Sequence, residues 1–527
     1  MTIFSKENEW TAYQTKRIKN GWPEFFRTNI LPNVDEDSYK VLYSDKKSRP
    51  NTPVNIMVCL EIIKTLLGVS DDEMVDQVLF NQKIQYSIGT LDMEEQPISK
   101  NVMSNFRVRI YNYEAKTGIN LLDNTLKMLN SKIIKMSSIG QGTKRIDSMM
   151  VSDSCKSMSR MELIYKINER FIEKLYELGE KIPGYFKCYL DEDNSVEVLY
   201  KTREFETGGK IKMLLNDSIK LHTKYKHNKR VNETKEFKQL ERLIDEQYDK
   251  DKKGPKDGHD IKPSSLQTPY DEDSTYRYKY KANKGYVGNI VEAVDTEKNL
   301  RLIDRWDVDK NTKSDKEFMK DYLKTKEGNT TEEVVIVDAA YFSKELNQEA
   351  KKVKVKLHPT DLTGKNDKDK ITNLSEFEIK ELENDNNLSK IYDVVDKCEN
   401  GCNPVESYFN VNTERIHAKF NKDICNNCPH KKECVVKSLI NVNKLNVNIE
   451  EVEYQKTRKE MLTTKYKEIS KIRAGIEGIP SLMRNVYNID KRTTKGLVYL
   501  KMKFGASMLS ININRMVKYQ KSNPIIA

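Results

Sequence analysis

The hydrophobic positions of this chain follow a helical period at first and a strand period further on. Up to about residue 135, apolar residues recur at helical spacing, most clearly in PVNIMVCLEIIKTLLGVSDDEMVDQVLFNQKIQYSIG. The segment GVSDDE interrupts this run, and Ser70 followed by Glu73 is a capping-box pattern that begins a second helix. A helix, a short turn with glycine and a second helix together predict a helix-turn-helix.

A further helix is predicted for ISKNVMSNFRVRIYNYEAKTG, which carries Arg107, Arg109 and Lys116. These cations have two interpretations. They contact DNA if the helical region is a DNA-binding domain, and they form a solvated basic face if it is an ordinary helical bundle. The pattern favours neither.

Strand patterns begin at TKRIDSMMVSD, with Asp147 near its middle. GYVGNIVEAVD and LRLIDRWDV flank TEKN and predict a β-hairpin, and VVIVDAAYFS and EAKKVKVKLHP predict two more strands. Amphipathic helices are predicted for SMSRMELIYKINERFIEKLYELGEKI and SDKEFMKDYLK, and an exposed loop for YDKDKKGPKDGHDIKPSS. The pattern therefore predicts one α/β unit, with Asp147 and Asp338 both on its strands.

Asp338 ends a run of four β-branched residues that predicts a strand buried on both faces. A buried carboxylate is costly unless something binds it. One interpretation makes Asp338 the N-cap of the helix FSKELNQEAKK. The other makes it a metal ligand at the carboxyl end of a strand, where α/β sheets usually place their sites. The strand taken alone favours the N-cap.

Two helical patterns close the chain, one running from Val452 through KIRAGIEGIPSLMRN and one across TTKGLVYLKMKFGASMLSININRMV. Arg473, Glu477 and Arg484 lie near one face of the first pattern. They fit a metal-binding acid between two phosphate-binding arginines, although spacing alone favours an exposed ion pair. Two glycines and a proline around Glu477 predict a bend or break in this helix.

The composition indicates the charge expected of a binding partner. The chain has 91 Lys and Arg against 80 Asp and Glu. The net charge of +11 is in the direction expected for a polyanion partner such as nucleic acid. A merely basic soluble protein has the same balance. No apolar run is long enough for a transmembrane helix, and MTIFSKENEW does not resemble a signal peptide, so a cytoplasmic location is expected.

Three acids on separate elements suggest a common chemistry. Asp147 and Asp338 lie on strands, and Glu477 lies on a helix that returns to them if the chain folds as one α/β core. Converging carboxylates repel one another unless cations hold them. Two Mg²⁺ ions fit this set, because Mg²⁺ prefers carboxylate and water ligands and two such ions stabilise both reacting oxygens of a phosphodiester.

Six blocks in this order resemble bacterial insertion-sequence transposases of the DDE class. The resemblance is to the type numbered eleven-eighty-two, which is related to the insertion-sequence-four group, and it runs over most of the chain. The blocks are SRPNTPVNIMVCLEIIKTLLGVSDDEMVDQVLFNQKIQYSIG with PISKNVMSNFRVRI, KRIDSMMVSDSCKSMSRMELIY, SLQTPYDEDSTYRYKYKANKGYVGNIVEAVD, VVIVDAAYFS, CNNCPHKKEC and IRAGIEGIPSLMRN. Each block is weak alone, and their order carries the resemblance.

The resemblance implies an α/β fold with a ribonuclease-H-like core that uses Asp147, Asp338 and Glu477 with two Mg²⁺ ions, Mn²⁺ being an alternative. It also implies an inserted segment between the second and third acids. Related transposases carry Tyr, Arg and Glu on the last helix; Arg473 and Glu477 fit this pattern, and Ser470 departs from it. Water would first attack the phosphodiester at an element end, and the freed 3′-hydroxyl would then attack target DNA.

The residues predicted to contact DNA are Arg107, Arg109, Arg473, Arg484 and Tyr341, the last with packing under the sheet as an equal alternative. The partners implied are the terminal inverted repeats of the element and target DNA, bound by a homodimer. Two other functions remain open. In the first, the chain is a non-catalytic, domesticated DNA-binding relative. In the second, it is a ribonuclease-H-like nuclease that acts on RNA or foreign DNA.

Four segments are predicted. Residues 1–135 form a helical N-terminal DNA-binding domain, and residues 136–365 form the first part of the core with a helical, charged insertion at about 156–265. Residues 366–450 form a polar insertion with a cysteine cluster and little core of its own. Residues 451–527 form the helices that complete the core.

Five of the eight cysteines fall in this polar insertion, in the spacings C-x3-C and C-x2-C-x5-C. They are Cys398, Cys402, Cys425, Cys428 and Cys434. Four thiolates from this set suit a tetrahedral, structural Zn²⁺ site, with His417 and His430 as weaker ligands. The alternative is a group of reduced thiols in a variable segment.

Overall fold

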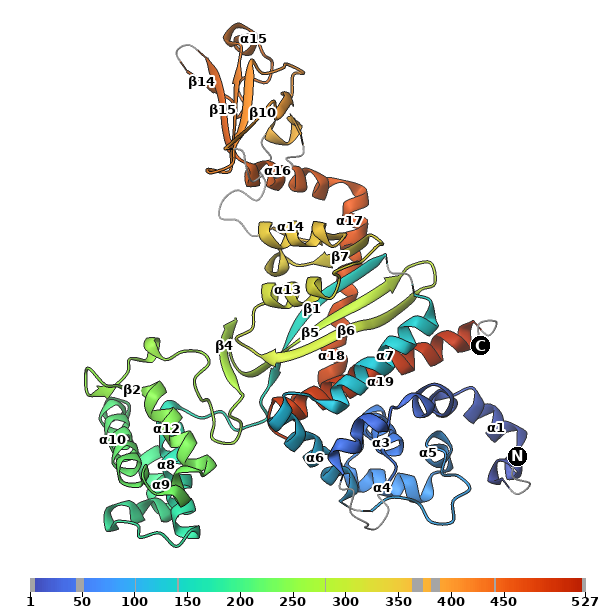
Figure 1. Cartoon of the computed structure of the whole chain (residues 1–527), viewed down its shortest axis with the longest axis vertical. Helices are drawn as coiled ribbons and strands as arrows, with labels where there is room; N and C mark the ends of the chain where they lie inside the picture. The colour runs from blue at the N-terminus through green and yellow to red at the C-terminus, as the bar shows by residue number, and fades with distance from the viewer. Residues whose placement is uncertain are drawn as a thin grey trace. The chain divides into compact units, whose positions relative to one another are not determined.

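The protein is described by a computed structural model that covers residues 5–43, 52–99, 101–139, 142–279, 281–362, 373–380, 389–439 and 442–523 (Figure 1). Two compact units make up the chain. The first unit comprises residues Met1–Tyr322 and Ile476–Ala527, and the second comprises Leu323–Gly475. Among the described residues, no helix has the length and apolar character needed to cross a membrane.

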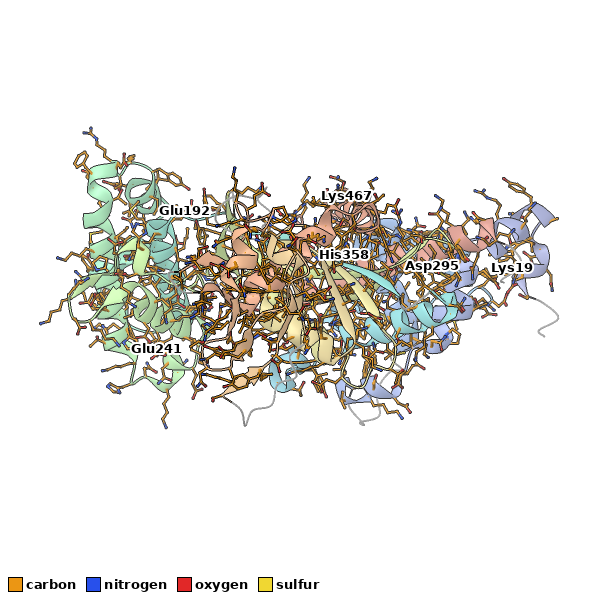
Figure 2. All side chains as sticks on the ribbon, turned by 90° about the horizontal axis from the view of Figure 1, so that it is seen from above. Lys19, Glu192, Glu241, Asp295, His358 and Lys467 are labelled. Atoms are coloured by element: carbon orange, nitrogen blue, oxygen red, sulfur yellow. The ribbon has the colours of Figure 1, made fainter. Side chains whose placement is uncertain are left out.

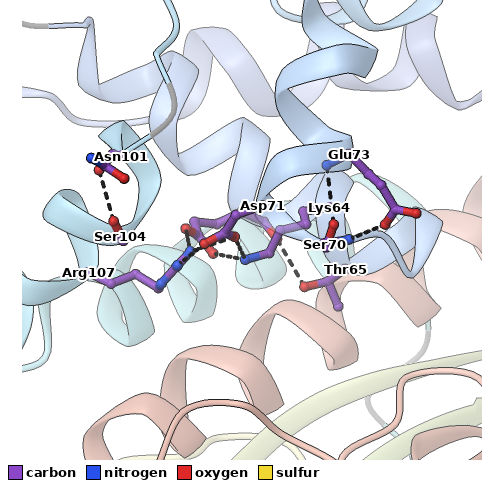
Figure 3. Close-up of polar contacts among 9 residues, drawn as sticks. Lys64, Thr65, Ser70, Asp71, Glu73, Asn101, Ser104 and Arg107 are labelled. Carbon is purple, nitrogen blue, oxygen red and sulfur yellow. Dashed lines mark hydrogen bonds and ion pairs between the residues drawn. The ribbon is translucent and has the colours of Figure 1, made fainter.

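The N-terminal region of the first unit is helical, as predicted. Its helices are α1 (Ala12–Lys19), α2 (Trp22–Phe25), α3 (Val54–Leu67), α4 (Asp71–Phe80), α5 (Gln82–Ser87), α6 (Val102–Thr117) and α7 (Leu121–Ser137). The predicted turn between α3 and α4 is confirmed, because Gly68 ends α3 with a φ of 70°, a left-handed conformation that suits glycine. The Ser70 hydroxyl accepts from the Glu73 amide at 3.2 Å, and the Glu73 carboxylate accepts from the Ser70 amide at 2.7 Å, which completes the capping box (Figure 3).

An antiparallel sheet forms the centre of the first unit. Its strands are β1 (Thr143–Ser152), β4 (Thr275–Lys279), β5 (Lys281–Asp295) and β6 (Leu300–Lys310). The long strand β5 pairs with each of the other three, and β5 and β6 form the predicted hairpin. In the β1–β5 register Asp147 lies opposite Ile290.

The last helix, α19 (Leu497–Ser522), packs on β6 and lies beside α7 (Figure 1). Two glycines make this approach possible. A Cβ added at Gly288 of β5 would lie 2.5 Å from the ring of Phe504, and one added at Gly505 of α19 would lie 3.1 Å from Leu126 of α7. The helices and the sheet share one buried cluster that extends from Phe25 to Met516.

A helical insertion follows β1 in the chain. It contains α8 (Arg160–Glu177), α9 (Glu192–Leu199), α10 (Thr207–Tyr225), α11 (Lys229–Asn232) and α12 (Lys235–Gln247). Helices α8, α10 and α12 pack on one another around a buried cluster of their own, separate from the cluster under the sheet. The segment expected to be an exposed loop contains the short pair β2 (Tyr248–Asp249) and β3 (Gly254–Pro255).

The second unit begins at Leu323, in the last turn of α13 (Asp315–Lys324), and a parallel β-α-β element follows. The strands β7 (Glu333–Val337) and β8 (Val355–Pro359) pair in parallel, and α14 (Lys344–Lys352) connects them. Three α-helices continue the chain after the cysteine-containing segment, namely α16 (Ile449–Leu462), α17 (Thr464–Lys471) and, in the first unit, α18 (Gly478–Asn485). Between α17 and α18, residues Ile472–Glu477 form a 3₁₀ helix, so the predicted break around Glu477 is confirmed.

The cysteine-containing segment is folded, and the expectation that it has little core of its own is wrong. A five-stranded antiparallel sheet contains β10 (Lys390–Tyr392), β12 (Glu406–Asn410), β13 (Arg415–Phe420), β15 (Asn443–Asn448) and β14 (Lys437–Ser438), in that order. Two further strands pair as β9 (Glu378–Ile379) and β11 (Val395–Lys397), and α15 (Lys422–Asn426) follows β13. Phe409, Ile416 and Leu445 are among its buried residues. Frequent Lys and Asn in this segment made the alternation of buried and exposed residues along its strands hard to recognise in the sequence.

A buried ion-pair group links the sheet of the first unit to α19. Glu292 of β5 is fully buried, and its carboxylate pairs with Arg145 of β1 and, at 2.7 Å, with Arg515 of α19. Removing one partner of a buried ion pair costs about 3–5 kcal/mol, because the remaining charge loses its compensation.

We therefore expect Glu292→Ala to lower the melting temperature clearly in thermal unfolding followed by calorimetry. Glu297→Ala, at an exposed position of the hairpin turn, is the matched control and should melt like the wild type. Equal melting temperatures for the two variants would show that the pair contributes little.

Candidate active site

Asp147 lies within β1, as predicted, and is partly exposed. Its carboxylate accepts from the Ser148 amide at 2.9 Å, and the Ser148 hydroxyl donates to Asp315 at 2.7 Å. Side chains alternate between the two faces of a strand, so Asp147 shares a face with Met149 and Val151. Met149 and Val151 are buried, whereas the side chain of Asp147 is partly exposed.

Glu477 belongs to the same unit and is exposed at the end of the 3₁₀ helix, where it precedes α18. The buried neighbours of Glu477 are Ile476, Ile479 and Met483, and they belong to the same cluster as Met149 and Val151. The segment that carries Glu477 and the strand that carries Asp147 therefore contribute side chains to one hydrophobic core.

Arg484 anchors the other end of α18 to this strand. Its guanidinium donates to the Met150 carbonyl of β1 at 3.1 Å and pairs with Asp490 at 3.2 Å. Asp490 in turn accepts from the Ser152 amide at 2.9 Å. The guanidinium predicted to bind DNA is thus engaged within the protein, where it holds α18 against β1.

In the second unit, Asp338 follows β7 directly, and it is not the N-cap of the helix FSKELNQEAKK, because Ser343 caps α14. One carboxylate oxygen accepts from the Ala340 amide at 2.9 Å and so caps a short 3₁₀ helix, Ala339–Tyr341. The other oxygen pairs with Arg473 at 3.4 Å. The Asp338 side chain is 31% exposed, so a capped carboxylate still faces solvent and a cation.

Ser470 and Arg473 lie on the same stretch of chain and bind different partners. The Ser470 hydroxyl lies 3.1 Å from Nε2 of His358, at the carboxyl end of β8. The His358 ring stacks on Tyr466 with 3.6 Å between centroids, and the Tyr466 hydroxyl donates to the Pro359 carbonyl at 2.7 Å. These contacts dock α17 on β8; Figure 2 labels His358 together with Lys467 of α17.

His358 and Tyr466 were missed by sequence reasoning. A histidine that ends the predicted strand VKVKLHP was the available signal, because side chains at the carboxyl ends of parallel strands meet at one edge of a sheet. Burial lowers the pKa of His358 to about 4, so the ring is neutral at physiological pH.

The other predicted DNA contacts differ in exposure. Tyr341 is fully buried, which supports packing and speaks against contact with DNA. Arg107 pairs with Glu61 and Asp71, and its side chain is only 12% exposed (Figure 3). Arg109 is exposed and lies with its guanidinium 4.6 Å from the Tyr43 ring centroid, so it is the more accessible member of the N-terminal pair.

The five clustered cysteines are free thiols, as are the remaining three. Burial raises the pKa of Cys425, and the neighbouring thiols of Cys398, Cys434 and Cys428 add to this rise. Burial and Cys398 raise the pKa of Cys402 in the same way.

No group of three or more His, Cys, Asp or Glu side chains in the described part of the chain is arranged to hold a metal ion. The prediction of a four-thiolate zinc site thus finds no support. The sheet that carries the cysteines has a hydrophobic core, against which Cys398, Cys425 and Cys434 pack.

Two family models match the chain. Residues 397–517 match a family described as Transposase DDE domain, and residues 23–109 match one described as Transposase domain (DUF772). Together they indicate a DNA transposase of the DDE class, and neither match alone covers half of the chain. The first contains Glu477, and the second contains the helix-turn-helix. No curated protein and no solved structure matches this chain.

The neutral His358 predicts a specific pH dependence. The pKa of His358 is about 4 in the folded protein against an ordinary value of 6.5, so the unfolded chain binds the proton more readily between these values. The stability contributed by the neutral ring is complete above pH 6.5 and is lost as the pH falls toward 4. One such group changes the free energy of unfolding by up to about 1.4 kcal/mol per pH unit.

His358→Phe keeps a ring on Tyr466 but cannot titrate. We expect its melting temperature to fall less than that of the wild type when the pH is lowered from about 7 to about 4.5. His259→Phe, at an exposed position, should behave as the wild type does. A wild-type acid dependence that persists in His358→Phe would assign it to other groups.

Proposed function

We propose that this chain is a DNA transposase that cuts the ends of its element and joins them to target DNA, with Asp147, Asp338 and Glu477 as its catalytic acids. The observation that carries the proposal is the pair of transposase-domain matches, one of which includes Glu477. The order of the sequence blocks further supports the eleven-eighty-two type, related to the insertion-sequence-four group, and a ribonuclease-H-like core.

The surroundings of the three acids support this role. Asp338 lies at the carboxyl end of a parallel strand, is partly exposed and already binds a cationic group, Arg473. Asp147 and Glu477 lie on elements of the first unit that share a buried cluster. Asp338 belongs to the other unit, and the proposal requires all three acids to act on one phosphodiester.

The proposed cofactor is a pair of Mg²⁺ ions, with Mn²⁺ as the alternative. The three side chains offer only carboxylate oxygens, the ligands that Mg²⁺ prefers. When bound, such ions activate the attacking oxygen and stabilise the leaving oxygen of the phosphodiester. A zinc ion has no part in this proposal.

Arg473 has two roles in the proposal. In the free protein it neutralises Asp338 across 3.4 Å. If Asp338 held a metal ion in place of Arg473, the Arg473 guanidinium would bind a DNA phosphate, to which arginine binds in bidentate geometry. Ser470 cannot supply the ring of the tyrosine found in related transposases, and here it holds His358 instead.

The N-terminal helices are proposed to bind the terminal inverted repeats. Arg109 and Lys116 are exposed cations of α6. Arg107 connects the same helix to α3 and α4 through its ion pairs with Glu61 and Asp71. Pairing two element ends takes at least two protomers, so a homodimer on DNA is part of the proposal.

Substitution of the proposed acids tests the function. We expect Asp338→Asn to lower Mg²⁺-dependent cleavage of element-end DNA by about 10²-fold or more, the order of loss when one preorganised electrostatic group is removed. Asp147→Asn and Glu477→Gln should behave alike, and binding of the same DNA should remain. The substrate is identified from the inverted repeats that flank the coding sequence.

Asp295→Asn, at the end of β5 in the hairpin, is the matched control and should cleave as the wild type does. Undiminished cleavage by Asp338→Asn would refute the assignment of the acids. A wild-type protein that binds these ends without cutting them in Mg²⁺ or Mn²⁺ would instead be the non-catalytic relative.

A further inference from the structure

The segment from Thr207 to Arg230, which forms α10 and the start of α11, has an unusual charge. It contains seven Lys and Arg residues and one acid, Asp217, whose side chain is 3% exposed. Some other basic residues of the insertion are paired with acids, such as Lys174 with Glu177 and Arg242 with Glu246. This segment therefore presents a local excess of positive charge within the insertion.

The cations on α10 follow its outward face. Leu214, Leu221 and Tyr225 are buried where α10 packs on α8 and α12. Lys212, Lys220 and Lys224 are exposed and are spaced by eight and four residues, which places them in one row along the helix. At 1.5 Å per residue, this row is about 18 Å long.

These side chains are available to bind a partner. Lys220 makes one long ion pair, 3.8 Å from Asp217. Around it, six cations form no salt bridge within 4.0 Å to a carboxylate of the described chain, namely Lys210, Lys212, Lys224, Lys226, Lys229 and Arg230. Solvated lysines in a row repel one another, so helix stability gives no reason for them.

The helix macrodipole does not explain the row either. It favours cations in the last turn, which accounts for Lys224. Lys212 lies in the N-terminal half of α10, where the helix dipole does not stabilise a cation. Neither helix stability nor the dipole accounts for Lys212, whereas a ligand of opposite charge would be attracted by the whole row.

Aromatic side chains lie beside the row. The Lys220 ammonium lies 5.2 Å from the ring centroid of Tyr185, and Tyr185 is 57% exposed. Phe205, two residues before α10, is 79% exposed. Exposed aromatic side chains stack on unpaired bases, so single-stranded DNA is the alternative ligand of this surface.

We propose that the outward face of α10 is a docking surface for the phosphate backbone of duplex DNA, independent of sequence. The row of about 18 Å matches about five base pairs along B-DNA. Lysine ammonium groups act as point charges toward phosphates and do not read base edges as arginine forks do. The surface lies outside both matched segments, and its ligand class depends on the proposed function.

The test removes three charges from the full-length protein. Lys212, Lys220 and Lys224→Gln is compared with the control triple Lys174, Lys238 and Lys250→Gln, which removes the same charge from other faces of the insertion. Binding to a fluorescent duplex of arbitrary sequence is measured by anisotropy over a series of salt concentrations. Thermal unfolding of both triples checks that the insertion stays folded.

We expect the α10 triple to weaken duplex binding by about tenfold or more and to lower the salt slope by about 2.7, or about 0.9 for each phosphate that is no longer neutralised. The control triple should change the slope little. Equal effects of the two triples, an unchanged slope, or a stronger reduction for single-stranded DNA than for duplex would overturn the proposal. Asp338→Asn separates it from catalysis, because that variant should retain the full slope even if no cleavage is found.

Discussion

Close packing of α19 on the central sheet is the constraint on which the first unit depends. Phe504 lies on Gly288 of β5, and Gly505 lies against α7, so both positions accept no larger side chain without movement. Trp306 of β6 is buried in the same place, and its indole donates to Asp123 of α7 at 3.2 Å. Because α19 packs on β6, α3 and α7, and the segment of Glu477 shares the same hydrophobic cluster, these elements are stabilised together.

Several arginines of this highly charged protein are used internally. The guanidinium groups of Arg107, Arg145 and Arg484 are held by carboxylates, two of them at positions where the sequence suggested DNA contact. Long-range ion pairs of this kind cannot be read from local spacing, because the partners come from other helices and strands. The lysine row on α10 differs from these arginines, because the ion pair that it forms among the described residues is a long one, from Lys220 to the buried Asp217.

Asp338 shows that a strand-terminal acid can cap a turn and bind a cationic group at the same time. Its carboxylate caps the next turn with one oxygen and binds Arg473 with the other. Capping orients the side chain and lowers its freedom, which favours the binding of a cationic group at the second oxygen.

By itself, the sequence determined the local elements: the helix-turn-helix with its capping box, the hairpin of β5 and β6, the strand before Asp338 and the break before Glu477. Each depends on residues close together in the chain, through periodicity, turn chemistry or capping. Tertiary structure alone decided that Tyr341 is buried, that His358 binds Ser470 and that the cysteine-containing segment has a core of its own. These outcomes depend on partners far apart in sequence, and burial and pairing at such distances leave no periodic trace in the chain.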